Sequence, residues 1–61
     1  MTLPPLHVNI GDRVIRRGGY NFRGYVVSSF KTLSNRDRTV VESEEIPGLL
    51  MIYNPEQLEK L

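Results

Sequence analysis

The chain has 61 residues, a formal net charge of +1, one histidine and no cysteine. A domain of this size buries only about 60% of its unfolded surface, which leaves its stability marginal. Disulfides are excluded, and His7 lacks the neighbouring ligands that a metal site needs, so no metal is expected. Self-association is the remaining way for so small a domain to gain stability.

Hydropathy and charge restrict the expected cellular location and the expected partners. No apolar run approaches the length of a membrane span and the sequence has no signal-peptide pattern, so we expect a cytoplasmic protein without membrane contact. Residues 1–38 carry seven basic and two acidic side chains (+5), whereas residues 39–61 carry one basic and five acidic side chains (−4). Either the halves pair with each other, or the basic half faces phosphates, or both are solvated strand faces.

In chain order, residues 1–9 are predicted to form a flexible extended arm, because Pro4-Pro5 does not fit a helix. The domain, residues 10–61, is expected to begin with a turn. Tyr20–Arg23 is predicted to be a loop that Gly24 closes. Runs rich in branched and aromatic residues between turn formers predict strands over residues 13–17, 25–30, 38–43, 49–53 and 58–61.

Five short strands separated by glycine and proline predict an all-β fold, and closure into a small five-stranded barrel would remove the exposed sheet edges. Residues 32–37 are the expected hairpin loop, and Pro47-Gly48 is a strong turn pair. Pro55–Gln57 suits a single helical turn near the C-terminus. Apart from its aromatic residues, the chain has few large side chains to fill a core. We therefore expect four aromatic residues inside it: Tyr20, Phe22, Tyr25 and Phe30.

The predicted strand over residues 49–53 is unusual because all five residues are apolar or aromatic. A half-buried strand alternates apolar with polar residues, and this one does not. Leu49, Met51 and Tyr53 point to one face, and Leu50 and Ile52 to the other. One small core covers only one of these faces. We therefore expect the face with Leu49, Met51 and Tyr53 to meet a partner chain, a ligand or both.

Two charged groups have candidate chemistry. Arg16-Arg17, at the end of the first strand and beside Gly18-Gly19, suits bidentate binding of phosphate or carboxylate, although surface solubility explains the pair equally well. Glu42 and Glu44 alternate onto one face and resemble paired catalytic carboxylates. Nothing in the sequence buries them, so a solvated face is the expected interpretation.

Part of the sequence has a more specific pattern. Residues 41–53 contain the ungapped run Val-Glu-Ser-Glu-x-x-Pro-Gly-x-x-x-Ile-Tyr. Outside this run, the pattern includes Gly11–Val14, Gly19, Gly24, Val27 and Leu58-Glu59. Over about residues 8–61, the chain resembles the type II (type B) plasmid-encoded dihydrofolate reductases, which confer trimethoprim resistance.

The resemblance implies an SH3-like barrel that assembles as a homotetramer with three perpendicular twofold axes. In that family, one central pore is the active site, where NADPH and the substrate dihydrofolate meet. The protein supplies no acid or base and works by holding a hydride donor against its acceptor. Such a pore would explain the doubly apolar strand, with one face in the core and the other lining the pore.

The family signature Val-Gln-Ile-Tyr corresponds to Leu50, Met51, Ile52 and Tyr53. The resemblance therefore implies that Met51, Ile52 and Tyr53 are catalytic, and that Leu50, Ile52 and Tyr53 also bind the cofactor. Ile52 would offer backbone groups to an amide, and Tyr53 a ring and a hydroxyl. Met51 replaces the family glutamine, and a thioether scarcely donates or accepts hydrogen bonds.

Other family positions are changed. The family lysine that attracts the anionic ligand tails aligns with Arg16, and the serine beside the cofactor aligns with Leu49. The resemblance assigns both residues to cofactor binding. A tryptophan and a histidine in the family's subunit contact align with Ser29 and Ile46.

Two other functions stay open. A small barrel of the same lineage serves equally as a non-catalytic module that binds a protein or a small ligand, because fold does not decide function. The run Gly-Asp-x-Val with spaced glycines also resembles KOW-type ribosomal modules, in which Arg16, Arg17 and Arg23 would contact phosphates. Of the three functions considered (reductase, non-catalytic binding module and nucleic-acid-binding module), nucleic-acid binding is the least expected.

Overall fold

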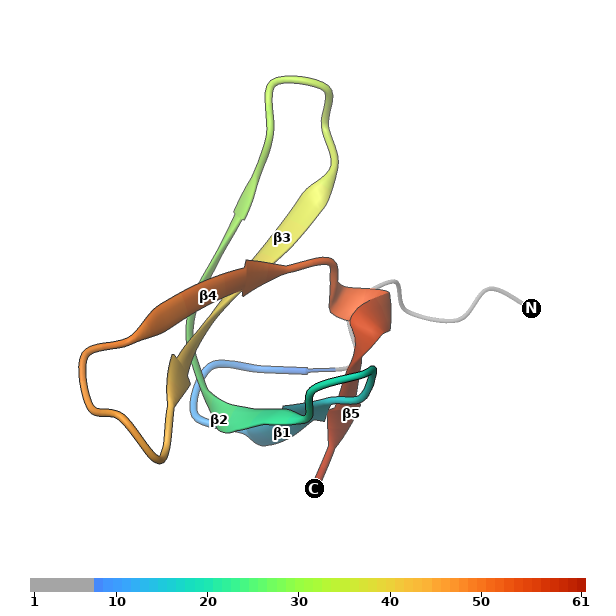
Figure 1. Ribbon diagram of the computed structural model, residues 1–61. Coiled ribbons are helices and arrows are strands. Elements are labelled where there is room, and N and C mark those ends of the chain that lie inside the picture. The colour runs from blue at the N-terminus through green and yellow to red at the C-terminus, as the bar shows by residue number, and fades with distance from the viewer. Residues whose placement is uncertain (1–7) are drawn as a thin grey trace.

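The computed structural model describes residues 8–61, which form one antiparallel sheet of five strands and a single helical turn (Figure 1). This confirms the all-β fold and the helical turn. The sheet order is β4-β3-β2-β1-β5. The elements are β1 (Arg13–Arg16), β2 (Phe22–Lys31), β3 (Asp37–Ser43), β4 (Leu50–Tyr53), the 3-10 turn η1 (Pro55–Gln57) and β5 (Leu58–Lys60).

The sheet is strongly curved, although its strand order is open. β4 and β5 are its two ends, so closure into an SH3-like barrel stays a prediction. Phe22 on β2 and Tyr53 on β4 nevertheless place their rings 5.7 Å apart, edge to face, even though β3 separates their strands. The curvature therefore brings the β4 end of the sheet back over β2.

The predicted loop before β2 is wrong at its end, because Phe22, Arg23 and Gly24 already belong to the strand. Gly24 lies opposite Ser43 on β3. A Cβ atom at Gly24 would overlap the carbonyl oxygen of Glu42. The missing side chain thus permits the close approach of β2 and β3, a role that the sequence does not distinguish from a loop glycine.

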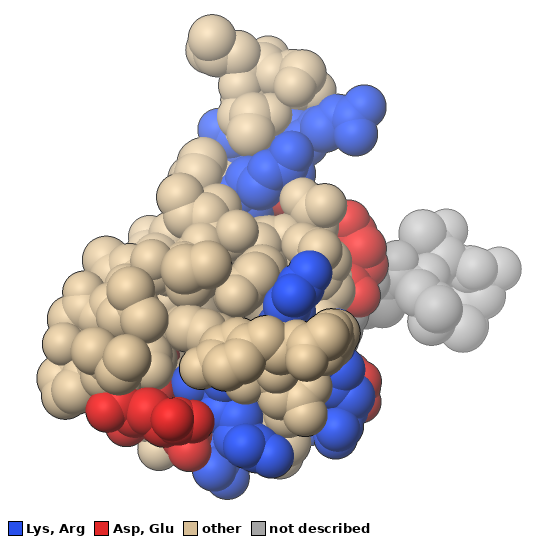
Figure 2. Space-filling model, viewed as in Figure 1, with Lys and Arg blue, Asp and Glu red and all other residues tan. Residues whose placement is uncertain are grey.

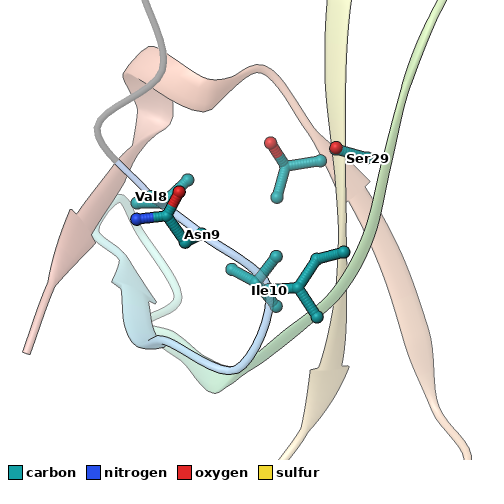
Figure 3. Close-up of a pocket in the computed structure, with 6 residues that line it drawn as sticks. Val8, Asn9, Ile10 and Ser29 are labelled. Carbon is teal, nitrogen blue, oxygen red and sulfur yellow. The ribbon is translucent and has the colours of Figure 1, made fainter.

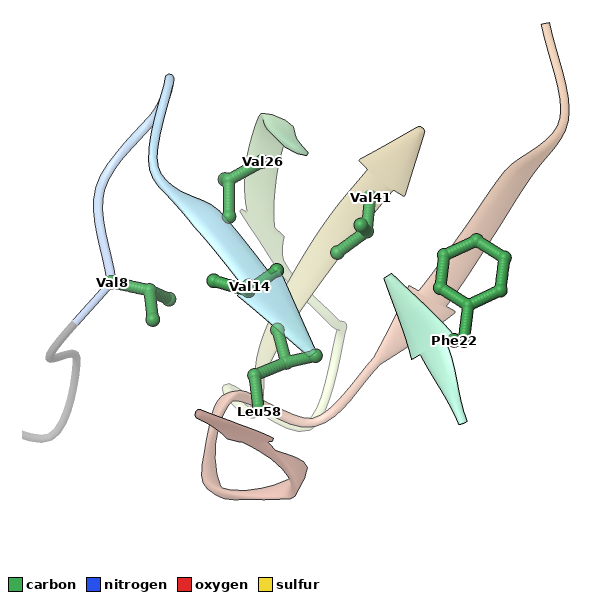
Figure 4. Packing of buried hydrophobic residues seen from close by; sticks show 6 residues of the cluster. All are labelled: Val8, Val14, Phe22, Val26, Val41 and Leu58. Atoms are coloured by element: carbon green, nitrogen blue, oxygen red, sulfur yellow. The ribbon is translucent and has the colours of Figure 1, made fainter. Parts of the chain in front are cut away.

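The core consists mainly of branched aliphatic side chains gathered on the concave side of the sheet (Figure 4). Of the four aromatic residues expected inside, Phe22 is buried, whereas Tyr20, Tyr25 and Phe30 are exposed. Alternation along β2 explains Tyr25, because burial of Phe22, Gly24 and Val26 turns it outward. Tyr20 lies before β2, and Phe30 lies beyond the register shift between Val26 and Ser28. The buried cluster comprises Val8, Val14, Phe22, Val26, Val41 and Leu58.

The predicted arm lies largely outside the described residues, which begin at Val8. Val8 itself is buried in the core cluster. Within residues 8–61, no helix is long and apolar enough to cross a membrane. The β2–β3 hairpin extends beyond the rest of the sheet (Figure 1), and Asn35 in its turn has a φ of 63°.

Candidate functional site

β4 is an edge strand whose apolar side chains are exposed on both faces. Leu50 and Ile52 are 53% and 57% exposed, and Met51 on the other face is 38% exposed. The expectation that one face lies in the core is therefore wrong for Leu50 and Ile52. Tyr53 is half-buried and packs against the core cluster instead. Leu50, Met51 and Ile52 are thus an apolar surface that the described residues leave uncovered.

The register of β3 and β4 explains which face turns inward. Met51 lies opposite Val41, and Tyr53 lies opposite Thr39. Both β3 partners are almost fully buried. Cross-strand partners point to the same face of a sheet, so Met51 and Tyr53 lie on the core side, at its open margin.

The turn before β4 is held by side chains at the end of β3. The Ser43 hydroxyl accepts hydrogen bonds from the backbone N–H groups of Glu45 at 3.1 Å and Ile46 at 3.0 Å. Glu42 Oε2 accepts from the Gly48 N–H at 3.0 Å. Gly48 has a φ of 88°, which confirms the Pro47-Gly48 turn. These contacts fix the direction in which the chain enters β4.

Arg16 reaches this surface from β1, although β1 and β4 are not neighbours in the sheet. It lies opposite the buried Phe22 on β2 and the buried Leu58 on β5, so its aliphatic stem starts on the core face. Its guanidinium carbon lies 5.4 Å from the centre of the Tyr53 ring. This distance is within the range of a cation–π contact.

The two arginines of the Arg16-Arg17 pair have different neighbours. Arg17 Nε lies 3.0 Å from a carboxylate oxygen of Glu59. Within residues 8–61, by contrast, no carboxylate lies within ion-pair distance of Arg16. Of the two guanidinium groups, the one beside β4 is therefore without a carboxylate partner among the described residues.

The candidate carboxylates do not form an acid–base pair. Glu44 accepts two hydrogen bonds from Arg13, at 2.9 and 3.0 Å. The hydrogen bond from Arg13 lowers the pKa of Glu44, and the same contact raises the pKa of Arg13. Glu42 is engaged at the Gly48 turn. Glu44 thus stays ionised at neutral pH and acts as a structural ion-pair partner rather than a general acid.

Charge and apolar surface separate on the molecule. Figure 2 shows an uncharged area over β4, with acidic groups at its lower edge, basic groups beside them, and further basic groups at the base of the β2–β3 hairpin. Among the described residues, three of the four ion pairs join the basic half of the chain to the acidic half. Two of these pairs, Arg13–Glu44 and Arg17–Glu59, join a basic residue of the first half to an acidic residue of the second, so part of the charge asymmetry is neutralised within the fold.

A separate pocket of about 420 Å³ lies between the residues before β1 and the middle of β2 and β3 (Figure 3). Ser29, which aligns with the family tryptophan, is part of its wall. The described walls carry no ionisable group, so this pocket is not the predicted anion site. Its lining residues are Val8, Asn9, Ile10, Val26, Ser29 and Thr39.

The geometry brings together only some of the residues that the resemblance assigns. Arg16 and Tyr53 are in contact, and Leu49–Ile52 continue from Tyr53 as an exposed apolar strand. Ile46 is also exposed. Within residues 8–61, no three His, Cys, Asp or Glu side chains come together as metal ligands. Such a site can bind a flat apolar ring beside an anionic group, without supplying a proton.

Gly18 was missed as a site residue. A Cβ atom added to it would lie 3.2 Å from Nη1 of Arg16, so its backbone adjoins the guanidinium. The only sequence signal was its position two residues after Arg16, beside the Arg16-Arg17 pair. The chain matches no protein-family model, and no curated protein matches it.

Proposed function

We propose that the protein is an NADPH-dependent dihydrofolate reductase of the type II kind, active in the central pore of a cytoplasmic homotetramer and insensitive to trimethoprim. The observation that carries this proposal is the position of Arg16. Its guanidinium adjoins Tyr53 at the end of an apolar strand that residues 8–61 leave exposed. A cation beside an apolar platform suits ligands that join a flat ring to phosphates or carboxylates.

The residues of this surface have distinct roles in the proposal. Arg16 binds the anionic part of a ligand, and Tyr53 and Met51 contact its ring system. Because β4 is an edge strand, every second residue turns its backbone N–H and C=O groups away from the sheet. These groups of Ile52 can bind an amide. NADPH supplies the hydride when it is bound. The chain contributes proximity, orientation and exclusion of water, which need no catalytic carboxylate.

Assembly is required by the proposal, since β4 alone is an open surface. Contiguous exposed apolar surface generally marks an interface or a ligand site. We expect a homotetramer by light scattering at protein concentrations of tens of micromolar. A monomer at these concentrations would contradict the shared pore and, with it, the proposed reductase.

The decisive experiment measures NADPH oxidation that depends on dihydrofolate, with trimethoprim present. We expect activity in the wild type and a large loss in Arg16→Met, which keeps an unbranched apolar stem but removes the charge. The wild-type affinity for NADPH should also fall as salt rises, because the contact is electrostatic. A tetramer that binds NADPH but never oxidises it with dihydrofolate would indicate a non-catalytic binding module.

Met51 offers a gain-of-function test of the same site. Met51→Gln adds an amide that both donates and accepts hydrogen bonds, and each such bond is worth about 0.5–1.5 kcal/mol net. A tetramer contains four copies of this position, so we expect higher reductase activity. Met51→Leu is the matched control, because it keeps the apolar surface without adding a polar group. Equal activities of the two variants would contradict an orienting role for position 51.

A further inference from the structure

We infer that Gly18 is a positioning residue for Arg16: together with the Tyr53 ring, it sets the direction in which the guanidinium presents its N–H groups to a phosphate. The inference deepens the proposed function and rests on it for the identity of the natural ligand. Its own content is narrower, because it concerns how this chain prepares an anion-binding group before any ligand arrives.

The first step is the close approach of Gly18 to the guanidinium. A Cβ atom at Gly18 would lie 3.2 Å from Nη1 and 3.5 Å from Cζ of Arg16. At Gly19, by contrast, an added Cβ would meet nothing within 4 Å. Of these two adjacent glycines, only Gly18 therefore adjoins the Arg16 head group.

The second step concerns the orientation of that head group. The guanidinium lies 5.4 Å from the centre of the Tyr53 ring, and Tyr53 is fixed in turn by its edge-to-face contact with the buried Phe22. An arginine held against an aromatic ring keeps the N–H groups at its edge available for a bidentate anion. The ring and the Gly18 backbone thus restrict a side chain that otherwise has many rotamers.

The third step is the electrostatic setting. Arg16 is half-buried, and its strand neighbours Phe22 and Leu58 are buried. The adjacent Arg17 is already paired with Glu59. A positive charge at the margin of an apolar core attracts an anion more strongly than one on a fully solvated stem. The shared ligand chemistry is a phosphate or diphosphate group attached to a flat ring.

The test compares Gly18→Ala with Gly19→Ala in the intact protein. Both substitutions remove a glycine from the same turn, and neither position has the positive φ that would strain an alanine. The atom nearest to the new methyl group at position 18 is the far end of a flexible side chain, so folding should survive. Urea unfolding of both variants checks this point.

Two probes report on the guanidinium. Inorganic pyrophosphate and NADPH are titrated separately, while NMR follows the Nε–Hε signal of Arg16, which the Tyr53 ring current should shift in the free protein. We expect Gly18→Ala to move this signal and to weaken binding of both probes severalfold, with Gly19→Ala like the wild type. Arg16→Met should lose about tenfold in affinity or more, as expected for a charge-assisted hydrogen bond.

Equal signals and affinities in the two alanine variants would overturn the positioning role of Gly18. Pyrophosphate binding that is unchanged in Arg16→Met would overturn Arg16 as the anion-binding group. If Gly18→Ala does not fold, Tyr53→Leu replaces it with pyrophosphate as the probe, because pyrophosphate has no ring for Tyr53 to contact: weaker binding is expected, and an unchanged affinity overturns the inference. If the expected order of affinities holds but dihydrofolate-dependent NADPH oxidation is absent, the proposed function fails while this inference stands.

Discussion

Val41 and Met51 lie opposite each other on adjacent strands, yet their surroundings differ completely. Val41 on β3 is fully buried under the core cluster, whereas Met51 on β4 is 38% exposed. Both side chains are apolar, so hydropathy does not distinguish them. Position in the sheet does, because β3 has a strand on each side and β4 has one. The comparison teaches that apolar residue type alone does not place a side chain in the core, because an edge strand has no neighbour to cover one of its sides.

Gly24→Ala should lower the free energy of unfolding more than the other substitutions, because it disrupts the buried region. The new methyl group would overlap the Glu42 carbonyl oxygen and approach a methyl group of Val41, so β2 and β3 must separate. We expect a loss of about 3 kcal/mol in the free energy of unfolding, measured by urea denaturation. Gly19→Ala should change it by less than about 0.5 kcal/mol. A Gly24→Ala variant as stable as the wild type would contradict the close packing of the two strands.

The cross-strand pair itself provides a sharper test. Val41→Ala should lower the free energy of unfolding by about 2 kcal/mol, because it leaves a cavity in the core. Met51→Ala should change it by less than about 0.5 kcal/mol in dilute protein, where β4 is solvated. At higher concentration its effect should grow, since assembly stabilises the folded state by mass action. Equal effects of the two substitutions in dilute protein would mean that β4 is buried within a single chain.

Thr39, which lies opposite Tyr53, tests the margin between the two regions. Its side chain is almost fully buried, and its hydroxyl has no hydrogen-bond partner among the described residues. Thr39→Val removes this hydroxyl without changing the shape, so we expect the free energy of unfolding to rise by about 1 kcal/mol. Thr39→Ser keeps the hydroxyl and loses the methyl group, so it should destabilise. A destabilised valine variant would reveal a partner for the hydroxyl.

The smallest expected effect is the pH dependence of the Arg13–Glu44 pair. Arg13 lowers the pKa of Glu44 in the folded chain, so the pair stabilises the protein above the ordinary glutamate range. This contribution is lost as the pH falls through the lowered pKa. Urea unfolding at several acidic pH values should therefore show a shallower pH dependence in Glu44→Gln than in the wild type. Identical slopes would show that the pair does not contribute.

Much of the fold follows from local rules. Pro47-Gly48 and Pro55–Gln57 adopt the turn and the helical turn that their residue types favour. The start of β2 was not predictable in the same way, because Gly24 serves a contact with β3, which is distant in sequence. The same reason applies to Tyr20, Tyr25 and Phe30, whose exposure depends on register and not on residue type.

The candidate site was predicted only in part for a related reason. The apolar character of residues 49–53 is visible in the sequence, and so is the basic Arg16-Arg17 pair. Their contact is not, because it depends on curvature that brings Arg16 on β1 to Tyr53 on β4 across two intervening strands. The inward orientation of Tyr53 likewise depends on its pairing with Thr39.

The pairing of β5 with β1 has a consequence for biosynthesis. Val14 lies opposite Lys60 and Arg16 lies opposite Leu58, so β1 can complete its pairing only after β5 has been synthesised. Leu58 is also a member of the buried cluster. A nascent chain can form the β1–β2–β3 meander while residues 58–60 are still inside the ribosome, but it cannot close its core. The core therefore closes only once residues 58–60 have left the ribosome, and until then the incomplete sheet exposes apolar surface.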